Sequence, residues 1–219
     1  MSDDERGFES RGTDRLVAFS DAVVAIAITL LALDLPVPTG TTMPKFLASV
    51  GNGTDEYVAF LISFVVIAAA WRRYHGVFRY IERVDSRVRN YNVLWLLTII
   101  LNPFATRVLT VQGQNAAGPR GLQFGFYALL QVVSSAALLL IVHHVAAHDL
   151  QASDTPPITD AQSDWESYGV MLGFGLSIPL FFVTSYAWVI WILVPLVVGR
   201  LGDRRRRRGG PARVPPKTT

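Results

Sequence analysis

The sequence predicts an all-α integral membrane protein with six transmembrane helices per subunit. Of its 219 residues, 51% are hydrophobic and only 17% are charged, a balance too apolar for a soluble domain of this size. The hydrophobic residues form blocks about as long as a helix that crosses a bilayer, roughly 20 residues. The chain has no Cys, which excludes disulfides, thiol nucleophiles and thiolate metal sites.

The first span is expected over residues 16–35, after a charged leader at residues 1–13. A helix of this length rises about 30 Å, the thickness of a bilayer core. The leader is mixed in charge and the apolar run is longer than the core of a signal peptide, so we predict an uncleaved span. Asp21 lies within this run. Because a carboxylate there costs roughly 2.5–3.5 kcal/mol on insertion scales, Asp21 is expected to face protein or water and to have a partner.

Three further apolar blocks predict the second, third and fourth spans at residues 57–74, 93–111 and 122–146. Residues 36–53, 112–121 and 149–164, which are rich in Gly, Pro or polar residues, are expected to be loops.

The last apolar block, residues 168–201, is too long for one helix. Pro179 and the Ser185-Tyr186 pair offer places to break it, so we predict a tight hairpin of two short spans. Gly169 and Gly173 have the spacing of a motif for close helix packing.

The basic residues predict that both termini are cytoplasmic. With that orientation, 17 of the 20 Lys and Arg residues lie inside, and only Lys45, Arg107 and Arg120 lie outside. Residues 14–202 would then form the membrane domain and residues 203–219 a basic cytoplasmic tail. In the tail, Arg204 to Arg208 would anchor the topology, with contact to anionic lipid worth about 1 kcal/mol per charge as a secondary effect. Because the basic excess sits at membrane boundaries, nucleic-acid binding is not expected.

Several motifs then stand out along the chain. Arg15, Phe19, Ser20 and Asp21 form an Arg-x-x-x-Phe-Ser-Asp motif, followed by Ala25-Ile26-Ala27, Thr29-Leu30-Leu31 and Leu33-Asp34-Leu35. This order resembles the first-helix signature of the transmembrane protein 175 family, the lysosomal and bacterial potassium channels. Two further elements are similar to motifs of that family: Trp71-x-x-Tyr74-His75-x-x-Phe78, with Tyr74 in place of a first His, and Asn102-Pro103-Phe104-x-Thr106.

The resemblance implies a passive, potassium-selective channel that is a homotetramer and needs no cofactor. Its first helix would line the pore, with Ile26 as the narrowest ring. Helical periodicity places Ile26, Leu30 and Leu33 on one stripe with Thr29 beside it, although a stripe can be drawn on any apolar helix. Such an apolar ring gates by dewetting, and Thr29 hydroxyls could replace lost water ligands of potassium.

Ser20, Asp21, His75 and Asn92 are expected at a similar depth near the cytoplasmic end. Asp21 with His75, assisted by Trp71 or Arg15, would form a hydrogen-bonded cluster that fixes the first helix against its neighbours. Ser20 and Asp21 diverge by about 100 degrees on one helix, which leaves no separate base and orienting group for a hydrolase. We therefore do not expect an enzyme.

Three alternatives remain open at this point. His144 and His148 have the spacing of a helical metal pair, but no Glu or Cys completes a site, so His143, His144 and His148 are interpreted as interfacial residues. A proton-linked secondary transporter that uses Asp21 and His75 as a relay is the second functional hypothesis. A non-conducting membrane scaffold is the third.

Overall fold

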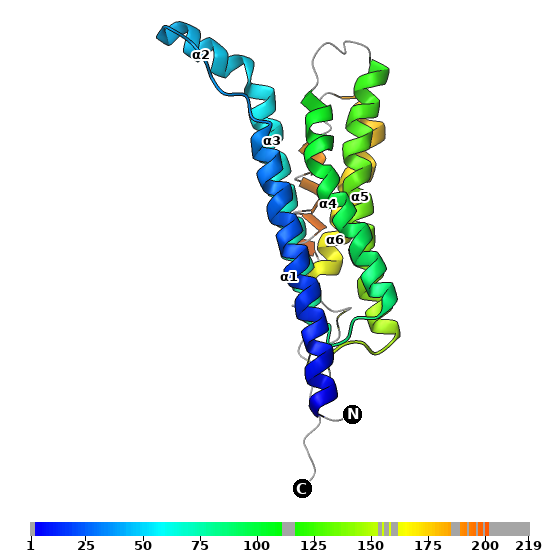
Figure 1. Cartoon of the computed structure of the whole chain (residues 1–219). Coiled ribbons are helices and arrows are strands. Elements are labelled where there is room, and N and C mark those ends of the chain that lie inside the picture. The colour runs from blue at the N-terminus through cyan, green and yellow to red at the C-terminus, as the bar shows by residue number, and fades with distance from the viewer. Residues whose placement is uncertain are drawn as a thin grey trace.

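The computed structural model describes residues 3–110, 117–152, 155, 158, 162–184, 189–191, 193–195, 197–198 and 200–201. These residues form a bundle of long helices (Figure 1). The named helices are α1 (Asp3–Leu33), α2 (Met43–Asn52), α3 (Thr54–Phe78), α4 (Ser86–Thr110), α5 (Ala117–Ala147) and α6 (Gln162–Phe181). Described residues between 190 and 201 are helical as well. The basic tail at residues 203–219 lies outside the described residues.

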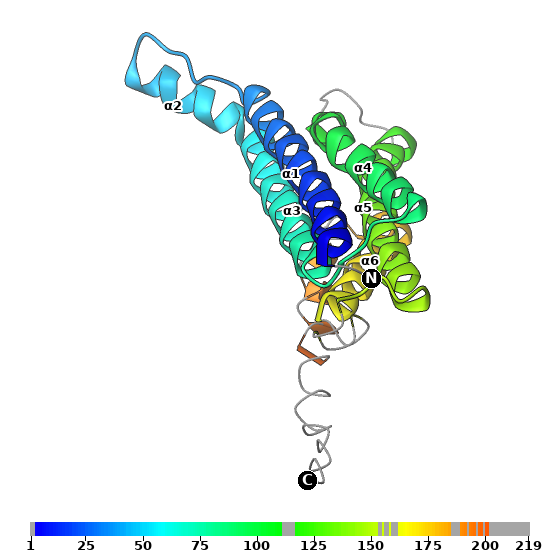
Figure 2. The same cartoon turned by 60° about the horizontal axis from the view of Figure 1, so that its bottom comes forward.

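Among the residues that the structure describes, four helices are long and apolar enough to cross a membrane. Their apolar parts are Gly12–Leu33, Thr54–Phe78, Ser86–Thr110 and Gly118–Ala147, which overlap the four spans predicted first. The chain is therefore an all-helical, multi-pass membrane protein. In Figures 1 and 2, α1 lies beside α3 and α4 lies beside α5. We refer to the end of the bundle that holds the start of α1 as the lower end, as in Figure 1, and to the other as the upper end.

The helix ends differ from the predicted spans mainly where polar residues continue a helix beyond its apolar part. α1 begins at Asp3, within the predicted leader, and stops at Leu33 rather than at residue 35. α4 starts at Ser86 and α5 at Ala117, so part of the predicted loop at residues 112–121 is helical, while residues 111–116 lie outside the described residues. Hydropathy detects the part of a helix that is in lipid and misses the part that extends into water.

The predicted loop at residues 36–53 contains the short helix α2, which the sequence analysis missed. α2 projects away from the bundle at the upper end (Figures 1 and 2) and has no buried residue. Pro44 occupies its first turn, where a missing N–H costs nothing. The helix ends at Asn52, and an added Cβ on Gly53, the next residue, would lie 2.9 Å from Cγ of Pro36, so this close approach favours glycine.

Aromatic rings fill two parts of the core. In the lower half, Tyr74 of α3 stacks on Trp95 of α4 with ring centroids 4.3 Å apart. In the upper half, Trp191 stacks on Phe124 and Phe174, at 4.7 and 4.8 Å. Large rings bury much apolar area at little cost in side-chain entropy, so they hold neighbouring helices at a fixed rotation.

The last apolar block folds back on itself as a helical hairpin. Pro179 stands inside α6, which ends two residues later, and Trp191 Nε1 donates a hydrogen bond of 2.7 Å to Ser177 Oγ. An added Cβ at Gly169 would lie 3.0 Å from Cα of Pro195, and Gly173 is similarly close to residues 190–195. The two glycines therefore form the close-packing face that their spacing predicts. Ser185 and Tyr186, the other predicted break, lie outside the described residues.

Candidate functional site

α1 has two faces with opposite environments. Four residues spaced four, three and four apart are nearly inaccessible and face the bundle: Ser20, Val24, Ala27 and Leu31. The opposite face carries Ile26, Leu30 and Leu33, whose exposed fractions are 58%, 45% and 78%, together with exposed Thr29. Within the single chain nothing covers this apolar face over the described residues. It is therefore available to lipid, to other copies of the chain or to an enclosed path.

Thr29 presents its oxygen lone pairs on that exposed face. Its Oγ1 donates a hydrogen bond of 2.7 Å to the carbonyl oxygen of Ile26, one turn earlier. Because the hydroxyl hydrogen is directed into the helix, the oxygen is left to accept a hydrogen bond or to ligate a cation.

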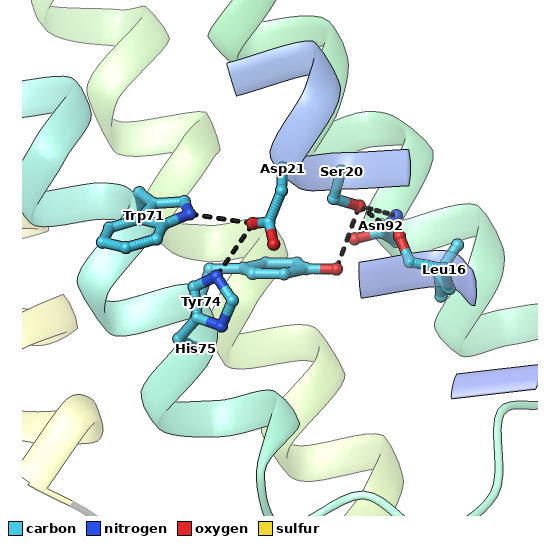
Figure 3. Close-up of polar contacts among 7 residues, drawn as sticks. All are labelled: Leu16, Ser20, Asp21, Trp71, Tyr74, His75 and Asn92. Carbon is cyan, nitrogen blue, oxygen red and sulfur yellow. Dashed lines mark hydrogen bonds and ion pairs between the residues drawn. The ribbon is translucent and has the colours of Figure 1, made fainter. Parts of the chain in front are cut away.

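Ser20 is the centre of a fully buried polar cluster (Figure 3). Its Oγ accepts hydrogen bonds from Tyr74 Oη at 3.0 Å and from Asn92 Nδ2 at 3.1 Å. Ser20 Oγ in turn donates to the carbonyl oxygen of Leu16 at 2.9 Å. Side chains of α3 and α4 thus meet at one hydroxyl of α1. Tyr74, which the sequence analysis noted only as a departure from a motif, supplies one of the two donors.

Asp21 organises a second, half-exposed cluster beside the first. Its Oδ1 lies 2.8 Å from Trp71 Nε1 and 2.8 Å from His75 Nε2 (Figure 3). A carboxylate can only accept, so His75 carries its hydrogen on Nε2. The rings of Trp71 and His75, one helical turn apart on α3, lie 4.6 Å apart between centroids. One carboxylate oxygen therefore joins α1 to a full turn of α3.

The other motif residues of α1 lie outside these clusters. The partners of Asp21 are Trp71 and His75 rather than Arg15, which is exposed. Phe19 is 60% exposed. Both side chains are exposed at the surface of the single chain, and neither takes part in the two clusters.

A cavity of about 380 Å³ opens beside the Asp21 cluster at the lower end. It is lined by residues of α1 and of the end of α3, among them Asp14, Asp21, His75 and Arg79. Water entering this cavity reaches Asp21, which accounts for its 40% exposed side chain.

The upper end of α1 is tied to α4 by an ion pair between Asp34 and Arg107. The Oδ1 and Nη1 atoms are 3.2 Å apart, and both side chains are partly exposed. Such an exposed pair contributes at most about 1 kcal/mol. The pair adds a second contact between α1 and α4, above the Ser20–Asn92 hydrogen bond.

Two histidines near the end of α5 and one just after it make hydrogen bonds near the lower end. His144 Nε2 lies 2.7 Å from Oδ2 of Asp85, whose Oδ1 caps α4 by accepting the backbone N–H of Val88 at 2.8 Å. Partial burial raises the pKa of Asp85, but the hydrogen bonds from Val88, His144 and the backbone of Arg87 together hold it below its ordinary value. His143 and His148 are each bonded through Nδ1 to a carbonyl oxygen one turn earlier. Among the described residues, no group of three metal-ligating side chains is assembled.

The geometry does not support catalysis. Ser20 is fully buried and its hydroxyl hydrogen is donated to a backbone carbonyl, while Asp21 and His75 bond to each other rather than to a nucleophile. These side chains join α1 to α3 and α4 by hydrogen bonds.

Comparison with known proteins gives a consistent set of relatives. A family model described as the endosomal/lysosomal potassium channel TMEM175 matches residues 15–103. A potassium channel of Streptomyces collinus is 31% identical over 173 residues, which are 78% of this chain and 83% of that protein. A potassium channel of Chamaesiphon minutus is 37% identical over 103 residues, 46% of this chain and 51% of that protein.

Solved structures share the fold. The crystal structure of a lysosomal potassium-selective channel TMEM175 homolog from Chamaesiphon minutus superposes with a TM-score of 0.66 at 24% identity. The superposition covers 89% of this chain and 98% of that chain. Nearly the whole of that fold is therefore present here.

Proposed function

This chain belongs to the TMEM175 family of potassium channels, and we propose that it forms a potassium-selective channel whose pore is lined by the exposed face of α1. The chain is not an enzyme. The relatives named as potassium channels support potassium as the conducted ion. The exposed stripe of Ile26, Leu30 and Leu33 supports α1 as the helix that lines the pore. That stripe is the single observation that carries the proposal, because it is a continuous run of large apolar side chains that the single chain leaves exposed over the described residues of α1.

One helix cannot enclose a path, so the pore requires several copies of α1 around an axis. We propose a homotetramer. Each subunit would contribute six spans: the four apolar helices, α6, and the helical residues between 190 and 201. An even number of crossings, with the basic residues at the lower end, would place both termini in the cytoplasm.

The narrowest point would be a ring of Ile26 side chains. An apolar ring passes ions only when it is wide enough to retain water, so its width sets the barrier. Thr29 lies less than one turn further up on the same face, and its Oγ1 lone pairs could replace water lost from a potassium ion at the ring. Leu30 and Leu33 would extend the apolar lining of the pore toward the upper end.

The two polar clusters would hold this ring in place. Ser20 and Asp21 precede Ile26 by about one and a half turns, and their bonds to Tyr74, Asn92, Trp71 and His75 fix both the rotation and the height of α1. A helix that rotated by one residue would move by about 100 degrees and turn Ile26 away from the axis.

Reconstitution of the purified protein in planar bilayers with opposed potassium and sodium gradients tests the proposal. Unitary currents with a reversal potential near the potassium value are expected. Saturating flux without unitary currents would instead support the proton-linked transporter that uses Asp21 and His75. The absence of both would support a scaffold.

A further inference from the structure

Buried polar side chains form a column through the interior of the bundle, apart from the exposed face of α1. On α4 they recur at positions 92, 95, 98, 102 and 106, which is one face of a helix. On α5 they occur at positions 127, 131, 134 and 135, again on one face. All are at least nine-tenths buried. A membrane protein has no reason to bury so many polar groups unless they have partners.

The two stripes lie at matching heights. α4 and α5 are antiparallel neighbours (Figures 1 and 2), and Asp85 at the start of α4 meets His144 near the end of α5. Counting one residue up α4 for each residue down α5 places Trp95 level with Ser134, and Thr98 level with Gln131. Asn102 is then level with Tyr127. The polar residues of α5 thus fill the interval between Asn92 and Asn102.

At its two ends the column makes direct hydrogen bonds, although Asn92 Oδ1 at the lower end has no partner among the described residues. Below, Asn92 Nδ2 donates to Ser20 Oγ. Above, Thr106 Oγ1 lies 2.7 Å from Ser63 Oγ, which is 3.1 Å from Tyr127 Oη. These ends show that the interior accommodates paired polar groups.

Between the ends, the partners are missing. The following buried atoms have no hydrogen-bond partner among the described residues: Asn92 Oδ1, Trp95 Nε1, both polar atoms of the Asn102 amide, Gln131 Nε2, Ser134 Oγ and Ser135 Oγ.

The backbone adds one more acceptor, which lacks its helical donor, at the same height. Pro103 stands inside α4 and has no N–H, so the carbonyl oxygen of Ile99 lacks its helical donor. Donors and acceptors are therefore both left over, and they lie at matching heights on two adjacent helices. A bound species that can donate and accept at once would satisfy them.

We propose that this column holds a chain of ordered water molecules inside each subunit, bound by Asn92, Trp95, Asn102, Gln131, Ser134 and Ser135. Water is the ligand that fits, because the free atoms include both donors and acceptors and none of these six side chains is charged. A buried water needs two to four polar partners, and the seven free side-chain atoms over this interval could supply partners for several such waters. The site is distinct from the proposed pore, since none of its residues lies on the exposed face of α1.

Two tryptophans allow a direct test by radiolytic hydroxyl labelling of the full-length protein in nanodiscs. X-rays generate radicals from bound water, which oxidise the side chains next to it. Trp95 is fully buried with an unpaired Nε1, whereas Trp191 is 7% exposed and its Nε1 is bonded to Ser177. Internal water predicts that Trp95 is oxidised faster than Trp191, while access from bulk solvent alone predicts the reverse order.

A conservative variant ties the signal to the column. Ser134→Ala removes one free hydroxyl level with Trp95, and it is expected to slow oxidation of Trp95 severalfold and to leave Trp191 unchanged. If Trp95 in the parent protein is oxidised no faster than Trp191, the proposal is wrong. A high-resolution map in which the Asn102 and Gln131 amides bond to each other or to the backbone with no density between them would also overturn it. Potassium currents of Ser134→Ala should equal those of the parent protein. The labelling experiment therefore tests the water column, and the current measurement tests the pore proposal independently.

Discussion

His75 and Asp21 are joined by a hydrogen bond of 2.8 Å between Nε2 and Oδ1, although their positions in the sequence differ by 54. The same oxygen accepts the indole N–H of Trp71. The hydrogen bonds that hold α1 against α3 are therefore made by a different face of α1 from the one that carries Ile26. This separation between the residues that position the helix and those proposed to line the pore allows the two roles to be tested independently.

Ile26→Asn tests the constriction. Polar amides in the ring would let it wet more easily, so conductance should rise while discrimination between potassium and sodium falls. Single-channel recording under bi-ionic conditions measures both. Leu61→Asn on α3 is the matched control, because Leu61 is equally exposed, at 58%, but lies outside α1. If the selectivity of Ile26→Asn is unchanged, Ile26 is not the constriction, and the selective residue must be sought at Thr29, Leu30 or Leu33.

Asp21→Ala tests the half-exposed cluster. The change leaves Trp71 and His75 without their acceptor, and assembly or folding should weaken by about 1–3 kcal/mol. Asp21→Asn keeps an acceptor oxygen and should lose less. Thermal melting of the detergent-solubilised protein measures the difference, and an Asp21→Ala protein that assembled and melted like the parent would refute the positioning role.

Tyr74→Phe tests the buried cluster at Ser20. It removes one donor to Ser20 Oγ while keeping the ring stacked on Trp95 and Phe78. Stability should fall by about 1 kcal/mol, the typical net value of one buried hydrogen bond. Tyr168→Phe is the control, since Tyr168 is 42% exposed. Equal melting temperatures for the two variants would show that the Tyr74 hydroxyl contributes nothing.

Acidification should loosen the lower end through Asp85. Its pKa is lowered in the folded protein, so its carboxylate stabilises the fold above the ordinary value of 3.8, and this contribution is lost as the pH falls from there through the lowered pKa. Melting curves across that range should therefore show a steeper acid loss for the parent than for Asp85→Asn. Parallel pH profiles would mean that the cap on α4 does not depend on the charge.

Gly169→Ala tests the packing of the final hairpin. The new Cβ would lie 3.0 Å from Cα of Pro195, so backbone must move and stability should fall. Gly175→Ala is matched in chemistry but has open space around it, and it should be neutral or stabilise α6 by about 0.5–1 kcal/mol through lower backbone entropy. Similar melting temperatures for both variants would contradict the close contact.

The sequence by itself identified four apolar segments long enough to cross a membrane, within its prediction of six spans, and it predicted that Asp21 needs a partner. Both follow from the solvent: lipid accepts no unpaired polar group, so the lengths of the apolar runs and the placing of charges are restricted along the chain itself. The same reasoning missed α2, because a short helix outside the membrane leaves no such restriction in the sequence.

Only the tertiary structure decided which residues meet. Three contacts depend on the rotation and relative height of neighbouring helices. Asp21 bonds to Trp71 and not to Arg15, Tyr74 bonds to Ser20, and His144 bonds to Asp85. A shift of one residue turns a helix by about 100 degrees and changes every partner, and a hydrophobic pattern that is apolar on all sides does not fix that shift. The aromatic stacks and the shared hydrogen-bond acceptors fix it, and they exist only once the helices have packed.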